Sequence, residues 1–245
     1  MRRCPAGAMS DSPAAAPLAG LSIILPVLDE ADAICATLAV LAPWREHGAE
    51  VVVVDGGSRD ETPALAKPGA NLVLVAPRGR GAQMNAGARA ASGRLLLFLH
   101  ADTRLPQEGA REFAKLLTRS ADCWGRFDVR IEGRHRLLPL VAALMNLRSA
   151  LTGIATGDQA MFVSRDLFER AGGFQEIPLM EDIRLSRALR AVCWPLRLRC
   201  AVTTSGRRWD ARGPLRTILL MWTLRLLHFA GAPPAALARW YSVVR

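Results

Sequence analysis

Acidic residues follow three of the short apolar runs in the first half of the chain. Asp29 and Glu30 end the stretch SIILPVLDE. Asp55 ends VVVVD, and Asp102 follows LLFLHA. Ligands of open parallel sheets bind outside the carboxyl ends of the strands, so these acids are expected to line one crevice. Such a crevice repels a diphosphate unless a divalent cation bridges the two, which predicts cation-assisted binding of a phosphate-bearing ligand.

The loop after the first run, PVLDEAD, contains no glycine, and no G-x-G-x-x-G pattern follows any of the acidic run ends. The dinucleotide fingerprint needs these glycines so that a pyrophosphate can approach the backbone. The sequence therefore disfavours a nicotinamide cofactor.

A second acidic pair, Glu181 and Asp182, begins the helical-period segment EDIRLSRALR. A carboxylate there could take a proton from a reacting hydroxyl. It could also simply favour the positive end of a helix dipole, an effect of about 0.3 to 1 kcal/mol. The second interpretation explains any acid at this position, but it does not explain why GDQ and MED occur together.

The elements that must position these residues alternate between short apolar runs and helical periods. Strands are predicted at 22–28, 50–55, 71–75 and 94–99, and helices at 32–41, 62–67 and 81–91. This alternation is typical of a parallel sheet covered by helices, and the runs are apolar on both faces, as buried parallel strands are. We expect a doubly wound half up to about residue 105.

The second half is less regular but shows no linker or repeat. It predicts helices to about residue 120, at 137–151 and at 181–191, and strands at 123–131 and 196–201. The expected fold class is α/β, a single Rossmann-like domain with a mostly parallel central sheet flanked by helices. We divide the chain into a flexible leader (1–20), a domain (21–210, with halves 21–105 and 106–210) and a C-terminal helical extension (211–245).

The chain of 245 residues is 51% hydrophobic and 22% charged, which excludes a disordered protein. Its net charge of +10 comes almost wholly from arginine, since Lys67 and Lys115 are the lysines; we read it as compositional bias and expect no nucleic acid partner. Irregularly spaced cysteines indicate a reducing compartment. The N-terminus lacks a signal-peptide apolar region, and no apolar run is long enough to span a membrane, so we expect a cytoplasmic protein.

Several stretches occur in an order that resembles a known family: SIILPVLDEADAI, VVVVDGGSRDET, GRGAQMNAG, LLFLHADTRLP, and GDQAMFVSRDLFERAGGF with PLMEDIRLSRALR. Over roughly residues 21–209 they resemble glycosyltransferase family 2, which has the GT-A fold. GDQ, EIPLMED and TTSGRRW are similar to its radical-SAM/selenodomain-associated transferase 2 subgroup, linked to arsenosugar or carotenoid glycoside biosynthesis. The resemblance implies an inverting, metal-assisted transfer of a sugar from a nucleotide-diphosphate sugar, UDP-linked, to an acceptor hydroxyl.

The resemblance also implies a set of nucleotide-binding residues. Asp55 would contact the base or ribose, although a turn residue bonding the Gly56-Gly57 backbone is the alternative. Arg80 would face a phosphate, unless it is a surface arginine. The full nucleotide set implied is Pro26, Asp29, Glu30, Asp55, Arg80 and Asn85.

The family's Asp-x-Asp metal motif reads His100-Ala101-Asp102 in this chain. Asp102 matches the second aspartate, a ligand of Mg²⁺ or Mn²⁺. His100 replaces the first, and a neutral imidazole suits Mn²⁺ better than Mg²⁺. His100 contacting the sugar, or serving as an ordinary core histidine, are the alternatives.

On the acceptor side, Asp182 matches the family's catalytic aspartate and Glu181 is its neighbour. The resemblance places Gly157, Asp158 and Gln159 in the acceptor or sugar pocket. Arg207 and Arg208 would hold the diphosphate by charge-assisted hydrogen bonds, with a solvated basic loop as the alternative.

The C-terminal segment LRTILLMWTLRLLHFAG combines bulky apolar residues with spaced arginines. It would suit a peripheral contact with the inner face of the cell membrane and a lipid-like acceptor, or else pack on the domain or a second subunit. A small-molecule acceptor is equally compatible. Two further function classes remain: a nucleotidyltransferase, which would want a basic glycine-rich loop in place of PVLDEAD, and a non-catalytic nucleotide-sugar binder or membrane-surface protein.

Overall fold

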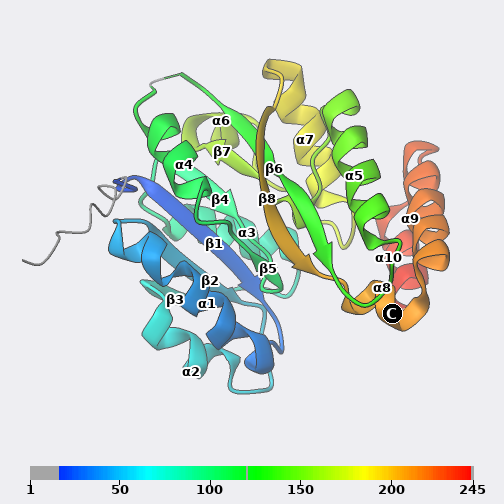
Figure 1. Cartoon of the computed structure of the whole chain (residues 1–245), viewed down its shortest axis with the longest axis horizontal. Coiled ribbons are helices and arrows are strands. Elements are labelled where there is room, and N and C mark those ends of the chain that lie inside the picture. The colour runs from blue at the N-terminus through cyan, green and yellow to red at the C-terminus, as the bar shows by residue number, and fades with distance from the viewer. Residues whose placement is uncertain (1–16, 120, 244–245) are drawn as a thin grey trace, which may run out of the picture.

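The computed structural model describes residues 17–119 and 121–243, so most of the expected leader lies outside the described residues. The described part forms one α/β domain around an eight-stranded sheet of order β3-β2-β1-β4-β7-β6-β8-β5 (Figure 1). The predicted fold class is confirmed.

The first half of the sheet is parallel and holds the acidic strand ends. Its elements are β1 (Leu21–Val27), α1 (Ala31–Glu46), β2 (Glu50–Asp55), α2 (Thr62–Ala66), η1 (Lys67–Gly69), β3 (Leu72–Val75), α3 (Arg80–Ala90) and β4 (Leu95–Phe98). In register, Val27 of β1 lies beside Asp55 of β2. The loops that carry Asp29 and Asp55 therefore leave the sheet at one edge, as expected for parallel strands.

The second half adds strands of mixed direction. Its elements are β5 (Thr103–Arg104), α4 (Gly109–Leu117), β6 (Trp124–Glu132), α5 (Leu138–Thr152), η2 (Gly157–Gln159), β7 (Phe162–Ser164), α6 (Arg165–Arg170), α7 (Glu181–Val192) and β8 (Leu196–Ser205). β7 runs antiparallel to both β4 and β6, while β8 is parallel to β6 and antiparallel to β5. The short β7 thus joins the two halves into one sheet.

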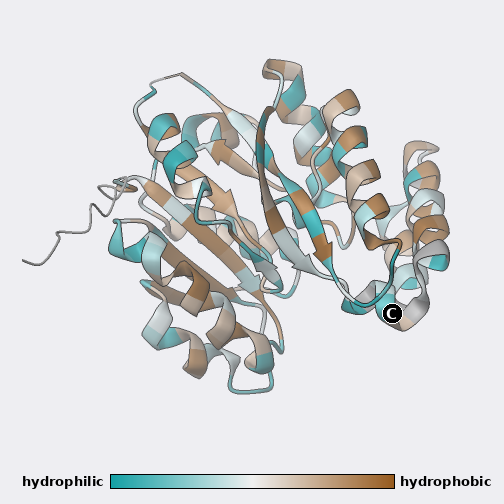
Figure 2. Cartoon of the chain, viewed as in Figure 1, coloured by the Kyte–Doolittle hydropathy of each residue, from teal (hydrophilic) through white to brown (hydrophobic). Residues whose placement is uncertain are grey.

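Alternate residues of the central strands pack into two different cores. Ile23 and Leu25 of β1 face α1, α4 and α5, whereas Ile24 faces α3, α6 and α7. Figure 2 shows these strands as largely hydrophobic. Burial on both faces explains why the runs are continuously apolar.

The C-terminal helices, α8 (Arg207–Arg212), α9 (Pro214–Phe229) and α10 (Pro234–Val243), lie at one end of the domain near α5 (Figure 1). Leu224 of α9 and Leu237 of α10 are buried against Ile154, Met180 and Ile183. One face of this segment therefore packs on the domain, as one of the sequence interpretations proposed. No helix in the described ranges has the length and apolar character needed to cross a membrane.

Some element predictions were wrong. β3 is an edge strand with Val75 72% exposed, so it is not buried on both faces. α1 continues through Pro43 to Glu46, and β8 extends to Ser205. β5 and β7 were not predicted, because two or three residues are too few to show a period.

Candidate active site

Hydrogen bonds tie together the loops that follow β1 and β2. The Asp29 carboxylate accepts the Arg59 N–H at 2.7 Å, and the Ser58 hydroxyl accepts the Asp29 N–H at 2.9 Å. Asp29 has a φ of 52°, a left-handed conformation that aspartate tolerates better than most residues. Glu30 is held through its N–H, which donates to the Thr62 hydroxyl at 2.8 Å. The two loops form one unit at the acidic edge.

Asp55 is almost fully buried at the end of β2. Its carboxylate accepts the Gly57 N–H at 2.9 Å, the Ser58 N–H at 3.0 Å and the Ser58 hydroxyl. The carboxylate therefore has the structural role that the sequence offered as the alternative to nucleotide contact, which is to close the turn at Gly56-Gly57. Its contact with a nucleotide remains a prediction.

Gln83 of α3 holds the ends of β1 and β2 together, and the sequence analysis missed it. Its amide nitrogen donates to the Val27 carbonyl at 2.8 Å and to the Val54 carbonyl at 2.9 Å. The side chain is 4% exposed and packs against Gly56, where an added Cβ would lie 3.0 Å from the amide. The sequence signal that could have indicated Gln83 is its position as a polar residue within the GRGAQMNAG stretch.

His100 and Asp102 lie on a tight turn after β4. The Thr103 N–H donates to the His100 carbonyl at 3.0 Å, and the Asp102 carbonyl accepts the Ser205 N–H at 3.1 Å. The Asp102 side chain is half-buried and accepts a 3.4 Å hydrogen bond from the Thr103 hydroxyl. Both candidate metal ligands are thus fixed at the carboxyl end of a central strand.

The turn η2 brings the GDQ motif onto His100. A Cβ added to Gly157 would lie 2.3 Å from His100 Cε1, and the Asp158 carboxylate lies 3.6 Å from His100 Nδ1. Gly157 is therefore required by the close approach of the imidazole. The resemblance implies a metal ligand at His100 and an acceptor or sugar pocket at the GDQ motif, and the structure brings these two positions into contact.

The Gly157→Ala variant should destabilise the protein by about 1 to 3 kcal/mol, because the new methyl group overlaps the His100 ring. In a His100→Ala background, which removes the ring, the same change should cost little. Thermal unfolding of the four proteins of this cycle measures the coupling. An equal cost in both backgrounds would contradict the contact.

Gln159 anchors η2 from inside the protein. Its side chain is fully buried, and its Oε1 accepts hydrogen bonds from the Ser149 hydroxyl at 2.7 Å and the Thr156 N–H at 3.2 Å. The Gly157 N–H in turn donates to Asp182 Oδ2 at 2.9 Å. A buried amide thus sets the turn that holds the Asp182 carboxylate.

The acidic pair at the start of α7 follows a strained residue. Met180, the N-cap, has a φ of 71°, which is unfavourable for a bulky side chain. Ala160, directly after the GDQ motif, is also left-handed, at 46°. Strain of this kind clusters at functional sites, where the surrounding structure fixes it.

Glu181 and Asp182 have different environments. Glu181 is 6% exposed, and its burial, followed by the neighbouring Asp182 charge, raises its pKa, an effect that Arg80 partly offsets. Asp182 is only half-buried, and Ile183 N–H donates to its second oxygen at 2.7 Å. Of the two, Asp182 is the carboxylate that a ligand can reach.

The raised pKa of Glu181 gives the wild-type stability a defined dependence on pH. The folded state keeps the Glu181 proton to a higher pH than the unfolded state, so stability falls as pH rises from near 4.5 through the raised pKa. Glu181→Gln should therefore raise the melting temperature relative to wild type more at pH 8 than at pH 5. The same difference at both pH values would contradict this assignment.

Arg80 and Asn85 begin and continue α3. The side chain of Arg80 is exposed, which fits the alternative of a surface arginine. The negative charges of Glu181 and then Asp158 raise the pKa of its guanidinium. Asn85 bonds the Phe174 backbone through both polar atoms, at 2.8 Å and 2.9 Å. Pro26 is buried within β1.

Asp102 and His100 offer one carboxylate and one imidazole as donors to a cation. Within residues 17–119 and 121–243, no group of three or more His, Cys, Asp or Glu side chains is placed to hold a metal ion unaided. Divalent cations in phosphate-binding sites take one or two carboxylates from the protein and further oxygens from the phosphates. The pair therefore fits a cation that is bound jointly with a phosphate ligand.

The matching family model decides the family. The model described as glycosyl transferase family 2 matches residues 22–168, which is more than half of the chain and includes β1 to β7. The chain belongs to glycosyl transferase family 2. The match includes the acidic edge, His100, Asp102 and the GDQ motif, and it ends before Glu181 and Asp182. The radical-SAM-associated subgroup is not resolved by this match.

Solved structures share the fold of this family 2 member. The mannosyltransferase PcManGT from Pyrobaculum calidifontis, in complex with GDP-Man and Mn²⁺, is 21% identical, with a TM-score of 0.60, over 84% of this chain and 60% of that chain. S. aureus TarS 1–349 with UDP-GlcNAc is 19% identical (TM-score 0.60; 76% and 58% covered). Glucosyl-3-phosphoglycerate synthase from Mycobacterium tuberculosis, with Mn²⁺, UDP and phosphoglyceric acid, is 21% identical (TM-score 0.59; 88% and 80% covered).

The chain spans about three fifths of the length of the first two of these structures. None of the curated proteins matches this chain. At these identities the structures establish the shared fold of the family 2 domain.

The predicted diphosphate arginines begin α8. Arg207 is exposed, and its N–H donates to the Ser205 hydroxyl at 3.3 Å. The side chain of Arg208 lies outside the described residues. Diphosphate binding by this pair remains a prediction.

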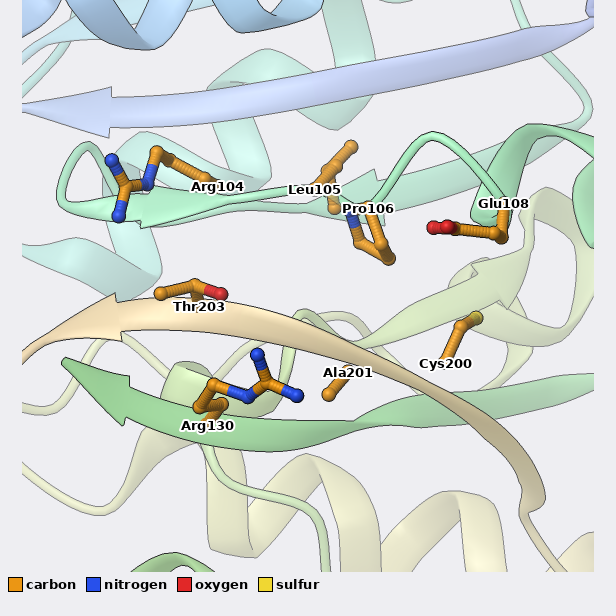
Figure 3. Close-up of a pocket in the computed structure, with 8 residues that line it drawn as sticks. All are labelled: Arg104, Leu105, Pro106, Glu108, Arg130, Cys200, Ala201 and Thr203. Atoms are coloured by element: carbon orange, nitrogen blue, oxygen red, sulfur yellow. The ribbon is translucent and has the colours of Figure 1, made fainter. Parts of the chain in front are cut away.

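A pocket of about 450 Å³ lies elsewhere in the molecule, between the 104–108 segment and the strands β8 and β6 (Figure 3). It is lined by Arg104, Leu105, Pro106, Glu108, Arg130, Cys200, Ala201 and Thr203. None of the acidic site residues lines it, so this pocket is separate from the candidate active site at the acidic edge and η2.

Proposed function

We propose that this chain is an inverting glycosyltransferase that moves a sugar from a UDP-linked donor to an acceptor hydroxyl. The observation that carries the proposal is the meeting of three segments at η2: His100 packs on Gly157, and the Gly157 N–H binds Asp182. The turn proposed to bind the cation and the half-buried Asp182 carboxylate are thereby brought to the same turn, η2.

The donor nucleotide would occupy the acidic edge formed by the loops after β1 and β2. Pro26, Asp29, Glu30 and Asp55 lie there, with Arg80 and Asn85 on the adjacent α3. Structural neighbours of this fold are complexed with UDP, UDP-GlcNAc or GDP-Man, which supports a nucleotide donor.

Asp102 and His100 would hold Mn²⁺ or Mg²⁺ together with the diphosphate oxygens. When bound, the cation supplies Lewis acidity that neutralises the leaving diphosphate. The PcManGT and synthase structures are complexed with Mn²⁺, which supports a divalent cation in this fold. Arg207 and Arg208 would add positive charge to the diphosphate.

Asp182 would act as the general base. The acceptor oxygen forms a bond to the anomeric carbon on the face opposite the diphosphate, the bond from that carbon to the diphosphate oxygen breaks, and the acceptor proton passes to Asp182. Glu181 keeps its proton to a higher pH because its pKa is raised, and this leaves the role of base to Asp182. Gly157, Asp158 and Gln159 would form the wall beside the acceptor and sugar.

The direct test of this function is release of the nucleoside diphosphate from UDP-, GDP- and dTDP-sugars in Mn²⁺, with candidate acceptors added. We expect release above the enzyme-free rate for UDP-sugars, increased by an acceptor. Tight nucleotide binding without release for any sugar and acceptor would favour the non-catalytic binder instead.

We further propose that the outer faces of α5 and α9 contact an anionic membrane surface peripherally. Each helix exposes a stripe at helical spacing: Leu140, Leu144, Leu147 and Leu151 on α5, and Leu219, Trp222, Leu226 and Phe229 on α9. Figure 2 shows hydrophobic residues along both helices. Residues 133–157 and 211–243 contain no acidic residue. Since the formal net charge of the chain is +10, a second copy of the chain would be repelled, whereas anionic lipids would be attracted.

Co-sedimentation with vesicles of phosphatidylcholine and phosphatidylglycerol tests this contact. The Leu144→Ser/Leu226→Ser double variant should bind at least about tenfold more weakly than wild type, because both leucines would leave apolar surroundings. Val75→Ser, an exposed apolar change on β3, is the matched control and should bind like wild type. Equal binding of the double variant, or no binding by wild type, would contradict the contact.

A further inference from the structure

Two arginines that no sequence motif includes lie beside the proposed base. Arg148 is on α5 and Arg225 is on α9. The Nε atom of each is buried and has no hydrogen-bond partner among the described residues. Arg148 donates one hydrogen bond, from Nη2 to the Ser149 hydroxyl at 2.8 Å. Neither arginine is part of an ion pair in the described ranges.

The fold fixes both arginines next to the active site. Ser149, adjacent to Arg148, donates a 2.7 Å hydrogen bond to Gln159, which anchors the turn that binds Asp182. Leu224, adjacent to Arg225, is fully buried in the cluster that contains Met180 and Ile183, the residues on either side of the acidic pair. Each arginine is therefore one residue away from a contact that positions Asp182 or its neighbours.

The charges of this pair are poorly compensated. Burial, followed by repulsion from Arg225, lowers the pKa of Arg148 to about 10. Burial also lowers the pKa of Arg225, and Asp182, then Asp158, offset this in part. Keeping two partly buried cations close together without ion pairs is costly, and this cost is characteristic of sites that await a ligand.

Guanidinium groups match phosphate and carboxylate geometry through paired hydrogen bonds. Arg148 is connected through Ser149 to Gln159 and so to the turn that binds Asp182. Leu224, next to Arg225, packs with Met180 and Ile183 on either side of the acidic pair. Both arginines therefore lie on the side of the protein that carries the proposed base.

We propose that Arg148 and Arg225 bind an anionic group, phosphate or carboxylate, carried by the acceptor, and so select acidic acceptors over neutral ones. This inference rests on the proposed function, because an acceptor exists only if the chain transfers sugar. The anionic group could belong to a lipid headgroup, reached along the apolar stripes of α5 and α9, or to a small soluble molecule.

Calorimetric titration with inorganic phosphate and with octyl phosphate tests the anion site, with octyl glucoside as the neutral probe. Arg148→Gln and Arg225→Gln should each weaken binding of the phosphate probes at least about tenfold, because each removes a charge-assisted contact. Arg148→Lys and Arg225→Lys, which keep the charge but lose the planar fork, should fall between wild type and the glutamine variants. Arg136→Gln and Arg216→Gln, at exposed arginines before α5 and on α9, are the matched controls and should bind like wild type.

Two further readouts separate the anion site from other roles. UDP affinity in Mn²⁺ should stay the same in the glutamine variants, and their melting temperature should not fall, since an uncompensated charge has been removed. Tighter binding of octyl phosphate than of inorganic phosphate identifies a lipid source, and equal binding identifies a soluble one; both support the site.

Three results would overturn the anion site: no phosphate binding by wild type, unchanged phosphate binding in both glutamine variants, or a parallel loss of UDP affinity, which would place the arginines on the donor diphosphate. Absence of UDP binding in wild type, with phosphate binding intact, would instead contradict the proposed function and remove the acceptor assignment with it.

Discussion

Replacing Asp182 with asparagine should lower kcat by about 10²- to 10⁴-fold, the usual contribution of a general base. The amide is nearly the same size as the carboxylate but cannot take a proton from the acceptor. Since Asp182 is held at the start of α7 by η2 and is not among the residues proposed to bind the nucleotide, nucleotide affinity should stay unchanged. Steady-state turnover and calorimetric UDP binding, measured on the same preparation, separate these two effects.

Glu176→Gln is the matched control for Asp182→Asn. Glu176 is an exposed acid in the loop before α7, close to the start of α3, and its removal changes the local charge by the same amount. It should retain wild-type turnover. If Asp182→Asn also retained turnover, or lost nucleotide binding together with activity, the assignment of Asp182 as the base would be wrong.

The second large effect is expected for Asp102→Ala. UDP affinity in Mn²⁺ should fall at least about tenfold, because the cation loses its carboxylate ligand and the diphosphate then faces the acidic edge directly. UDP affinity without metal should change little. Calorimetric titrations of UDP with and without Mn²⁺ measure both quantities.

Asp166→Ala, at an exposed aspartate on α6, serves as the control for Asp102→Ala and should bind UDP like wild type in Mn²⁺. Unchanged Mn²⁺-dependent affinity in Asp102→Ala would remove Asp102 from the metal site. His100→Ala then reports whether the imidazole contributes to the same ligand set, since it should weaken Mn²⁺-dependent binding less than Asp102→Ala.

The sequence predicted the strands correctly where both faces of the strand are buried. β1, β2 and β4 lie in the centre of the sheet, and their continuous apolar runs gave bounds within one residue of those observed. β7 was not accessible, because its three residues gain their partners from β4 and β6, far away in the chain. Such pairing depends on tertiary structure and leaves no local period.

The candidate site was accessible only in part. The positions of strand-end acids such as Asp55 follow from the rule for parallel sheets. The contact of His100 with Gly157 instead depends on the pairing of β7 with β4, which are far apart in the chain. Arg148 and Arg225 were missed because each resembles an ordinary arginine in an amphipathic helix. Their buried Nε atoms, and the contacts of their neighbours Ser149 and Leu224, become visible only when α5 and α9 are placed on the domain.

The most direct test of a metal-bridged nucleoside diphosphate site is a thermal-melting panel with UDP, GDP, dTDP and NAD, each with and without Mn²⁺. A ligand at about 100 times its Kd stabilises by about 2.7 kcal/mol, which for a chain of this size corresponds to about 5 to 11 °C. We predict a shift of this size for UDP that requires Mn²⁺, and none for NAD. No shift with any nucleoside diphosphate at saturating metal would contradict the donor site and the function built on it.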